Sequence, residues 1–198
     1  MSETGHQAVL ASGNQGKLRE LQHALSGTGW MLSNQSDFGV PEADETGLTF
    51  VENALIKARN AAQHTGLAAI ADDSGLVVPA LGGAPGIYSA RYSGRGDAGN
   101  NEKLLAAMRD FDGEQRRARF VCVLVLLRHA DDPLPIIAEG CWEGFIANAP
   151  RGDKGFGYDP IFLPEGQIRH AAELSQDEKR ALSHRGKAVA LLCQALHR

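Results

Sequence analysis

The chain has 198 residues with 43% hydrophobic and 22% charged side chains, a composition that fits a folded globular protein and excludes a disordered or fibrous one. Its 20 basic and 24 acidic side chains leave a formal charge of −4, which argues against a protein that coats a nucleic acid polymer. The longest apolar run, residues 120–127, is too short to cross a bilayer, and the N-terminal sequence lacks a signal-peptide pattern. We therefore expect a single domain over residues 1–198, in the cytoplasm, that binds neither nucleic acid polymers nor membranes.

The N-terminal segment predicts a strand, a loop and a helix. Residues 8–11 are apolar and read as a short buried strand. The polar loop 12–17 follows at once, and leucines 18, 21 and 25 then recur at helical spacing. This order places the loop at the N-terminus of a helix.

A second helix and strand follow. Residues 49–52 (T-F-V-E) form a capping-box pattern, so we expect a helix from there to about residue 64, with Gly66 as its stop. Residues 68–71 read as a buried strand that ends at the acidic pair 72–73.

The middle of the chain predicts an irregular segment and a hairpin. Residues 75–99 are dense in glycine and should form a turn-rich excursion without regular structure, after which a helix resumes near Asn101. Two β-rich runs, 118–129 and 135–147, are separated by the turn-like residues 130–133. These runs predict two strands joined as a hairpin.

The C-terminal part predicts a loop and two helices. Residues 151–164 are too rich in glycine for a helix, 175–182 open with a Ser-to-Glu capping box, and 187–196 are an apolar helix. The whole order predicts an α/β fold, with one sheet system flanked by helices and a cleft formed by loops from both halves.

The loop between the first strand and helix is a candidate phosphate site. The N-terminus of a helix offers free backbone N–H groups and a positive dipole end, and a lysine adds a full charge. The spacing differs from that of a P-loop, and the alternative is a glycine-containing turn with a solvated lysine. The loop residues are Ser12, Gly13, Asn14, Gln15, Gly16 and Lys17.

Two acidic pairs are candidate metal ligands. Asp44 and Glu45 precede a predicted helix, and Asp72 and Asp73 follow a predicted strand. Carboxylates from separate segments suit Mg²⁺, which prefers oxygen ligands and shares its shell with water and phosphate. Asp73 is the stronger candidate because ligands gather at strand ends in α/β folds. The alternative is that these acids are helix caps and solvated loop residues.

Aromatic and basic groups near the C-terminus are candidates for base recognition. Phe156 or Tyr158, in a glycine-rich loop, could stack on a purine or could fill the core. Lys179, His184 and Arg185 could read a keto oxygen or hold a phosphate, or they could stabilise a helix C-terminus.

Taken together, these segments resemble the Ham1/RdgB family of noncanonical purine nucleoside triphosphate pyrophosphatases. The resemblance implies two lobes around an elongated central mixed sheet, a nucleotide cleft between the lobes, a homodimer, and Mg²⁺-dependent hydrolysis of ITP, dITP and XTP to the monophosphate and pyrophosphate. It rests on six segments in order: LASGNQGKLREL, ETGLTFVENALIKAR, AIADDSGLVVPALGGAPGIYSARYSG, ARFVCVLVLLRHA, GFGYDPIF and AELSQDEKRALSHRGKA.

The resemblance also assigns roles to individual residues. It makes Asp73 the general base and a Mg²⁺ contact, and it gives the metal a second acid, either Asp44 or Glu45. The expected substrate contacts are the loop Ser12–Lys17 and Lys57 on the phosphates, Ser74, the base- and sugar-binding residues Phe156, Gly157, Tyr158 and Asp159, and the base-reading residues Lys179, His184 and Arg185.

Two rival functions remain from the sequence. One is a Maf-like pyrophosphatase acting on pyrimidine or modified nucleotides, against which the S-H-R and F-G-Y-D segments argue. The other is a non-catalytic nucleotide-binding module, which is disfavoured because Lys17, Glu45, Lys57, Asp73 and Lys179 are all present.

Overall fold

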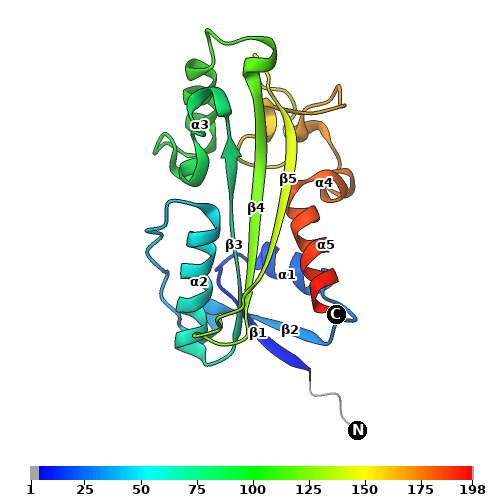
Figure 1. Cartoon of the computed structure of the whole chain (residues 1–198). Helices are drawn as coiled ribbons and strands as arrows, with labels where there is room; N and C mark the ends of the chain where they lie inside the picture. The colour runs from blue at the N-terminus through cyan, green and yellow to red at the C-terminus, as the bar shows by residue number, and fades with distance from the viewer. Residues whose placement is uncertain (1–4, 198) are drawn as a thin grey trace. The chain divides into compact units, whose positions relative to one another are not determined.

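The computed structural model describes residues 5–197, which form a mixed sheet flanked by helices (Figure 1). Within this range the sheet has six strands in the order β2-β1-β3-β4-β5-β6. The strands are β1 (His6–Leu10), β2 (Trp30–Asn34), β3 (Ala68–Val77), β4 (Arg117–Leu127), β5 (Ile136–Ile146) and β6 (Phe162–Pro164). The helices are α1 (Gln15–Ala24), α2 (Phe50–Thr65), α3 (Gly96–Ala107), α4 (Gln176–Leu182) and α5 (His184–Leu196). The short 3₁₀ helices are η1 (Gln35–Phe38), η2 (Pro79–Leu81), η3 (Gly86–Arg91), η4 (Gly113–Arg116), η5 (Asp159–Ile161) and η6 (Ala171–Glu173).

The chain divides into two compact units, in agreement with the expected two lobes. Unit 1 holds the chain up to Asp73, then Val123–Glu139 and the chain from Ala188 onward. Unit 2 holds Ser74–Cys122 and Gly140–Lys187. Because the boundaries fall inside β3, β4, β5 and α5, each of these elements contributes residues to both units.

Unit 1 is built on parallel strands. β1 pairs in parallel with β2 on one side and with β3 on the other, where Leu10 lies opposite Ile70. Helix α2 covers one face of this sheet, and α1 with α5 covers the other (Figure 1). Alanines make up most of the buried side of α2, which lets the helix pack close to the strands. The buried alanines are Ala54, Ala58, Ala61 and Ala62.

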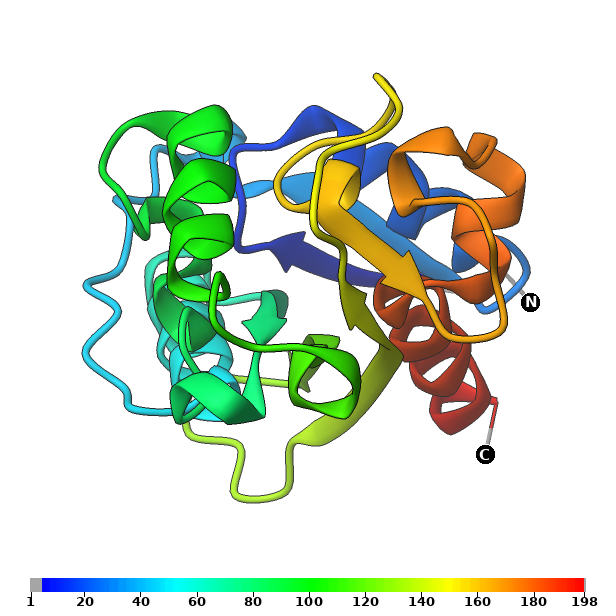
Figure 2. The same cartoon turned by 90° about the horizontal axis from the view of Figure 1, so that it is seen from above.

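Unit 2 has an antiparallel edge and an aromatic core. The short strand β6 pairs with the end of β5 (Figure 2). Phe120, Trp142 and Phe162 pack with ring centroids 4.7 to 6.3 Å apart, a range in which aromatic pairs attract one another. Arg116 is buried beside this core, where its guanidinium donates to backbone carbonyls rather than to a carboxylate. Each such bond to a charged group contributes about 1.5–3 kcal/mol.

Several predicted boundaries are confirmed. The two runs expected as a hairpin are β4 and β5, which are neighbours in the sheet. Helix α2 ends at Gly66, whose φ of 69° allows the left-handed cap. Helix α4 begins after Ser175 with the expected capping box. At α2 the box is altered, because Glu52 accepts from the N–H of Leu48 and from the hydroxyl of Thr49.

Three predictions were wrong. β3 does not end at the acidic pair but continues through Asp72 and Asp73 to Val77, so its last residues replace the start of the expected irregular segment. Helix α3 begins at Gly96, inside that segment, and 3₁₀ turns occupy part of the rest. Helix α5 begins at His184 rather than at residue 187. Strand β2 had no counterpart in the prediction. No helix in the described range is long and apolar enough to cross a membrane.

Candidate active site

The loop that follows β1 is held in shape by its own side chains. The Asn14 side chain caps α1 and accepts from the N–H groups of Gly16 and Lys17, at 2.8 and 3.1 Å. The N–H of Asn14 in turn donates to Ser12 Oγ at 3.1 Å. The expectation of free N–H groups at this helix end is therefore wrong for Gly16 and Lys17, because the cap already satisfies both.

Lys17 reaches from α1 to the sheet. Its Nζ donates to both carboxylate oxygens of Asp72, each at 2.9 Å. The Asp72 side chain is only 4% exposed, so this pair is largely removed from water. An anion that recruits Lys17 has to compete with Asp72.

Lys57 holds two carboxylates on the other side of the strand. From α2, its Nζ donates to Glu45 Oε1 at 2.9 Å and to Asp73 Oδ1 at 3.0 Å. Burial alone would lower the pKa of Lys57, but the nearby carboxylates, Asp73 foremost, outweigh it and raise that pKa. Burial raises the pKa of Asp73, with Lys57 opposing and Glu45 adding to the shift.

The second oxygen of Asp73 is buried and makes no hydrogen bond, so its lone pairs are available to a ligand. The Asn53 amide is near enough to lower the pKa of Asp73, but it is not in hydrogen-bonding geometry with that oxygen. Asn53 Oδ1 accepts from the N–H of Gly47 at 2.8 Å, which ties the Glu45-bearing loop to α2. An unsatisfied buried carboxylate oxygen is an unfavourable arrangement unless a ligand completes it.

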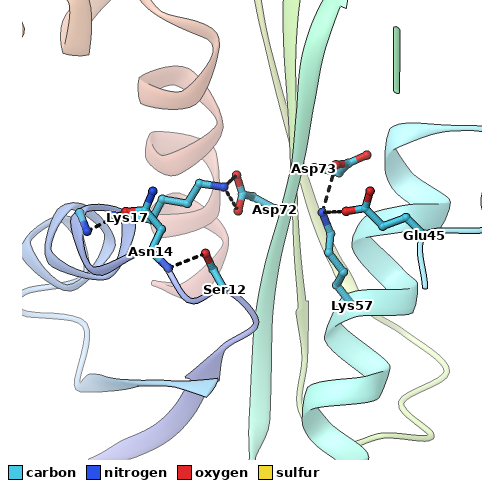
Figure 3. Close-up of polar contacts among 8 residues, drawn as sticks. Ser12, Asn14, Lys17, Glu45, Lys57, Asp72 and Asp73 are labelled. Carbon is cyan, nitrogen blue, oxygen red and sulfur yellow. Dashed lines mark hydrogen bonds and ion pairs between the residues drawn. The ribbon is translucent and has the colours of Figure 1, made fainter. Parts of the chain in front are cut away.

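The strand itself separates the two charged pairs. Successive side chains of a strand point to opposite faces, so Asp72 meets Lys17 on one face of β3 while Asp73 meets Lys57 on the other (Figure 3). Of the two candidate acids before α2, Glu45 lies beside Asp73 and Lys57, whereas the Asp44 side chain is exposed. Ser74 is half-buried and, because it lies two residues after Asp72, it points to the same face of β3 as Asp72.

In unit 2 the glycine-rich loop expected to bind the base has one exposed aromatic ring, Phe156, and one buried ring, Tyr158. Phe156 is 71% exposed. Tyr158 is buried in the core, and its hydroxyl donates to the carbonyl of Ser89 at 2.9 Å. Burial strongly raises the pKa of Tyr158, so the hydroxyl stays protonated. The proposal that an aromatic residue of this loop fills the core therefore holds for Tyr158 and not for Phe156.

Lys179 lies against the exposed ring of Phe156, and Asp159 contacts both Lys179 and the backbone of Phe156. Lys179 Nζ is 4.6 Å from the centroid of Phe156, in cation–π range, and it forms an ion pair with Asp159. Asp159 is buried and its Oδ2 also accepts from the N–H of Phe156 at 2.9 Å. One buried carboxylate thus fixes both the lysine and the backbone of the aromatic residue.

His184 and Arg185 open α5 instead of closing α4, so the expected helix C-terminal role does not apply. Ser183 alone separates the two helices, and its Oγ accepts from the N–H of Gly186 at 3.2 Å as a cap of α5. The imidazole of His184 stacks on Phe120, with ring centroids 4.9 Å apart and planes 11° apart. The aromatic core therefore sets the direction of this histidine, and both residues are half-buried.

Comparison with known proteins assigns the chain to a family. The family model described as the Ham1 family matches residues 8–195. The chain belongs to the Ham1 family. That match includes every candidate residue of the charged set in unit 1 and of the aromatic loop in unit 2.

Known proteins are similar to this chain over nearly its whole length. The dITP/XTP pyrophosphatase of Thioalkalivibrio sulfidiphilus is 62% identical over 191 residues, covering 95% of this chain and 97% of that protein. The dITP/XTP pyrophosphatase of Escherichia coli K12 is 58% identical over 190 residues, covering 95% and 96%. The solved HAM1 protein of Coxiella burnetii is 49% identical, with a TM-score of 0.93 and coverage of 97% and 98%.

Three residues that contact the candidate site of this Ham1-family protein were not predicted from the sequence. Asn53 was not considered, although a buried asparagine three residues into a helix rarely lacks a specific partner. Asp97 and Asn101, which contact the aromatic loop from α3, fell near a boundary that was itself misplaced. Their spacing of four on one helix face was the available signal once the helix start was known.

Proposed function

We propose that this protein hydrolyses dITP, ITP and XTP to the nucleoside monophosphate and pyrophosphate, and so removes deaminated purines from the nucleotide pool. The names of its relatives at 62% and 58% identity support the substrate class. The observation that carries the chemistry is the set of two carboxylates, Glu45 and Asp73, held by Lys57 with one buried Asp73 oxygen unsatisfied.

The triphosphate is proposed to bind along the edge of β3 beyond the end of β1. β1 pairs with β3 only as far as Ile70, where the N–H of Ala11 makes the last bond at 2.8 Å. Lys17 and Lys57 lie on opposite faces of β3 just past this point, so a chain of phosphates at the edge is within reach of both faces. Two lysines and the N-terminus of α1 would offset its negative charge.

The residues of unit 1 fit a Mg²⁺ ion that shares its ligands with the substrate. The described residues contain no group of three or more acidic, histidine or cysteine side chains placed to hold a metal unaided. Asp73 and Glu45 supply hard oxygen ligands, and the unsatisfied oxygen of Asp73 is available for one such bond. Bound there, Mg²⁺ would neutralise charge on the phosphates. Glu45 is preferred over the exposed Asp44 as the second ligand.

Asp73 is the proposed general base. Its pKa is raised by burial, which makes the carboxylate a better proton acceptor than an ordinary aspartate. It would orient the attacking water and accept its proton as the bond to phosphorus forms. Lys57, bonded to the other oxygen of Asp73, fixes the direction of that carboxylate.

The base is proposed to bind at the aromatic loop. Phe156 offers an exposed face for stacking, and Lys179, His184 and Arg185 supply donors for the 6-keto oxygen of hypoxanthine or xanthine. Adenine presents a 6-amino donor instead, and each unpaired buried polar group costs about 1–3 kcal/mol. Gly157 and Tyr158 shape this loop, Tyr158 by anchoring it in the core.

We infer a single functional domain, a homodimer and a cytoplasmic location, in keeping with a chain whose substrates are free nucleotides. A non-catalytic nucleotide-binding module is the rival. It shares the site residues but predicts binding without turnover.

The test is to follow dITP with Mg²⁺ by ³¹P NMR, in the wild-type protein and in Asp73→Asn. We expect equimolar monophosphate and pyrophosphate from the wild type. Asp73→Asn should lose at least about 10²-fold in turnover, the range of a general base, while it still binds dITP in calorimetry. Release of orthophosphate alone would refute the proposed bond cleavage, and full activity of Asp73→Asn would remove Asp73 from the chemistry.

A further inference from the structure

The exposed ring of Phe156 is not held in place by packing. At 71% exposure it has little contact with the core, so its direction depends on the backbone that carries it and on the Lys179 ammonium, 4.6 Å from its centroid. The residues on either side are Gly155 and Gly157, with φ of 80° and 61°. Glycine is the most mobile residue of a chain, so this backbone needs an external restraint to keep one conformation.

Helix α3 supplies such a restraint at Gly157. Asp97 Oδ2 accepts from the N–H of Gly157 at 2.7 Å, and Asn101 Nδ2 donates to the carbonyl of Gly157 at 2.9 Å. Asp97 and Asn101 are four residues apart and therefore lie on the same face of the helix. The N–H and the carbonyl belong to the two peptide planes that flank the Gly157 Cα atom. Bonding both planes fixes φ and ψ of Gly157, and with them the peptide that leaves Phe156.

We propose that Asp97 and Asn101 are positioning residues that orient the Phe156 ring to stack on the purine. The inference rests on the proposed function, in which Phe156 binds the base. The two side chains complete a frame around the ring, since Asp159 accepts from the N–H of Phe156 on the other side. A pre-oriented ring loses less conformational freedom when the base binds, which raises affinity without any added contact.

A simpler role for Asp97 has to be separated from this one. Asp97 lies in the first turn of α3, where a negative charge stabilises the helix dipole, and no side chain caps that helix end. Asp97→Asn removes the charge but keeps an oxygen that can accept from Gly157. Asp97→Ala removes both. The two variants therefore distinguish positioning through the hydrogen bond from stabilisation through the charge.

The first experiment is steady-state kinetics on dITP with Asp97→Ala, Asn101→Ala and Asp97→Asn. Glu102→Gln is the matched control, because Glu102 is exposed on the same helix and pairs only with the exposed Arg95 at 3.3 Å among the contacts described. We expect KM to rise about tenfold in Asp97→Ala and to rise in Asn101→Ala, with kcat within about twofold, as expected for lost uniform binding. Asp97→Asn and Glu102→Gln should stay near wild type, and inhibition by inorganic tripolyphosphate should not change in any variant.

A double-mutant cycle shows whether Asp97 acts through Phe156. If it does, Asp97→Ala should add nothing to the KM of Phe156→Ala. Additive effects, or Asp97→Asn behaving like Asp97→Ala, would overturn the proposal. If Phe156→Ala itself leaves KM unchanged, the base-stacking part of the proposed function fails, and the orientation claim is then judged by the next measurement alone.

The orientation can be measured without activity. Phe156→Trp, in a background in which Trp30 and Trp142 are replaced by Phe, places a single fluorophore at the loop. We expect its fluorescence anisotropy to fall when Asp97→Ala is added and to be kept when Asp97→Asn is added. Asn101→Ala serves in place of Asp97→Ala should that variant fail to fold. Equal anisotropy with and without the α3 side chains would contradict the positioning role.

Discussion

At the scale of single residues, Lys57 is the cation that pairs with both Glu45 and Asp73 in the unit 1 site. It neutralises two carboxylates that are 13% and 25% exposed, so its removal leaves two negative charges close together and partly out of water. A charge left without its partner in such a place costs about 1–3 kcal/mol after allowance for solvent screening. A divalent cation placed between the same carboxylates would offset that loss.

Lys57→Met should therefore lower the thermal stability of the metal-free protein and increase its response to Mg²⁺. We expect added Mg²⁺ to raise the melting temperature of Lys57→Met by more than that of the wild type, because binding to the folded state shifts stability by mass action. The measurement is thermal unfolding with EDTA and with Mg²⁺. Lys154→Met, which removes an exposed lysine, serves as the control. Equal Mg²⁺ shifts in wild type and Lys57→Met would argue against a metal at Glu45 and Asp73.

At the scale of elements, the sequence predicted helix ends well because side chains close to the ends determine them. Gly66 ends α2 and Ser175 opens α4 as expected. The extension of β3 could not be predicted in this way, because Asp72 and Asp73 have low strand propensity and are stabilised there by Lys17 and Lys57 from distant helices. Because β3 continues through both acids, their side chains point to opposite faces, which the sequence analysis did not predict.

The aromatic loop is an element whose glycines can be tested directly. Gly155 has φ 80°, and a Cβ there would collide with Asp159 Oδ2, whereas Gly166 has φ 74° and a Cβ there would meet nothing within 4 Å. Both alanine variants carry the left-handed strain of about 1–2 kcal/mol, and only Gly155→Ala adds a collision with the residue that holds Lys179 and Phe156. We expect urea denaturation to show a clearly larger loss for Gly155→Ala, together with a raised KM for dITP. Equal losses in the two variants would show that the close approach to Asp159 is unimportant.

At the scale of the whole molecule, the two units are tied by the path of the chain. It passes from one unit to the other at residues 73–74, 122–123, 139–140 and 187–188, inside three strands and one helix. We therefore expect the two units to unfold together. Their division was partly foreseen from the resemblance, but its boundaries were not, since nothing in the sequence of β4 or β5 marks a break.

The two tryptophans test this coupling, because Trp30 lies in unit 1 and Trp142 in unit 2. In Trp142→Phe the fluorescence reports unit 1, and in Trp30→Phe it reports unit 2. For each variant, urea unfolding is followed both by fluorescence and by circular dichroism, so that any change in its stability affects both curves alike. We expect the two transitions to coincide, as in a two-state process. A fluorescence transition that precedes the loss of secondary structure in either variant would mean that its unit unfolds independently.

Substrate selection can be tested by measuring kcat/KM for pyrophosphate release from dITP, XTP, GTP and ATP, with Mg²⁺ and with EDTA. We expect Mg²⁺-dependent turnover of dITP and XTP that exceeds that of ATP at least about tenfold, the factor expected when one or more buried polar groups are mispaired. Equal turnover of all four nucleotides would keep a pyrophosphatase but contradict recognition of the 6-keto group by the unit 2 donors. Tight binding of dITP with no turnover in Mg²⁺ would contradict the enzymatic function itself.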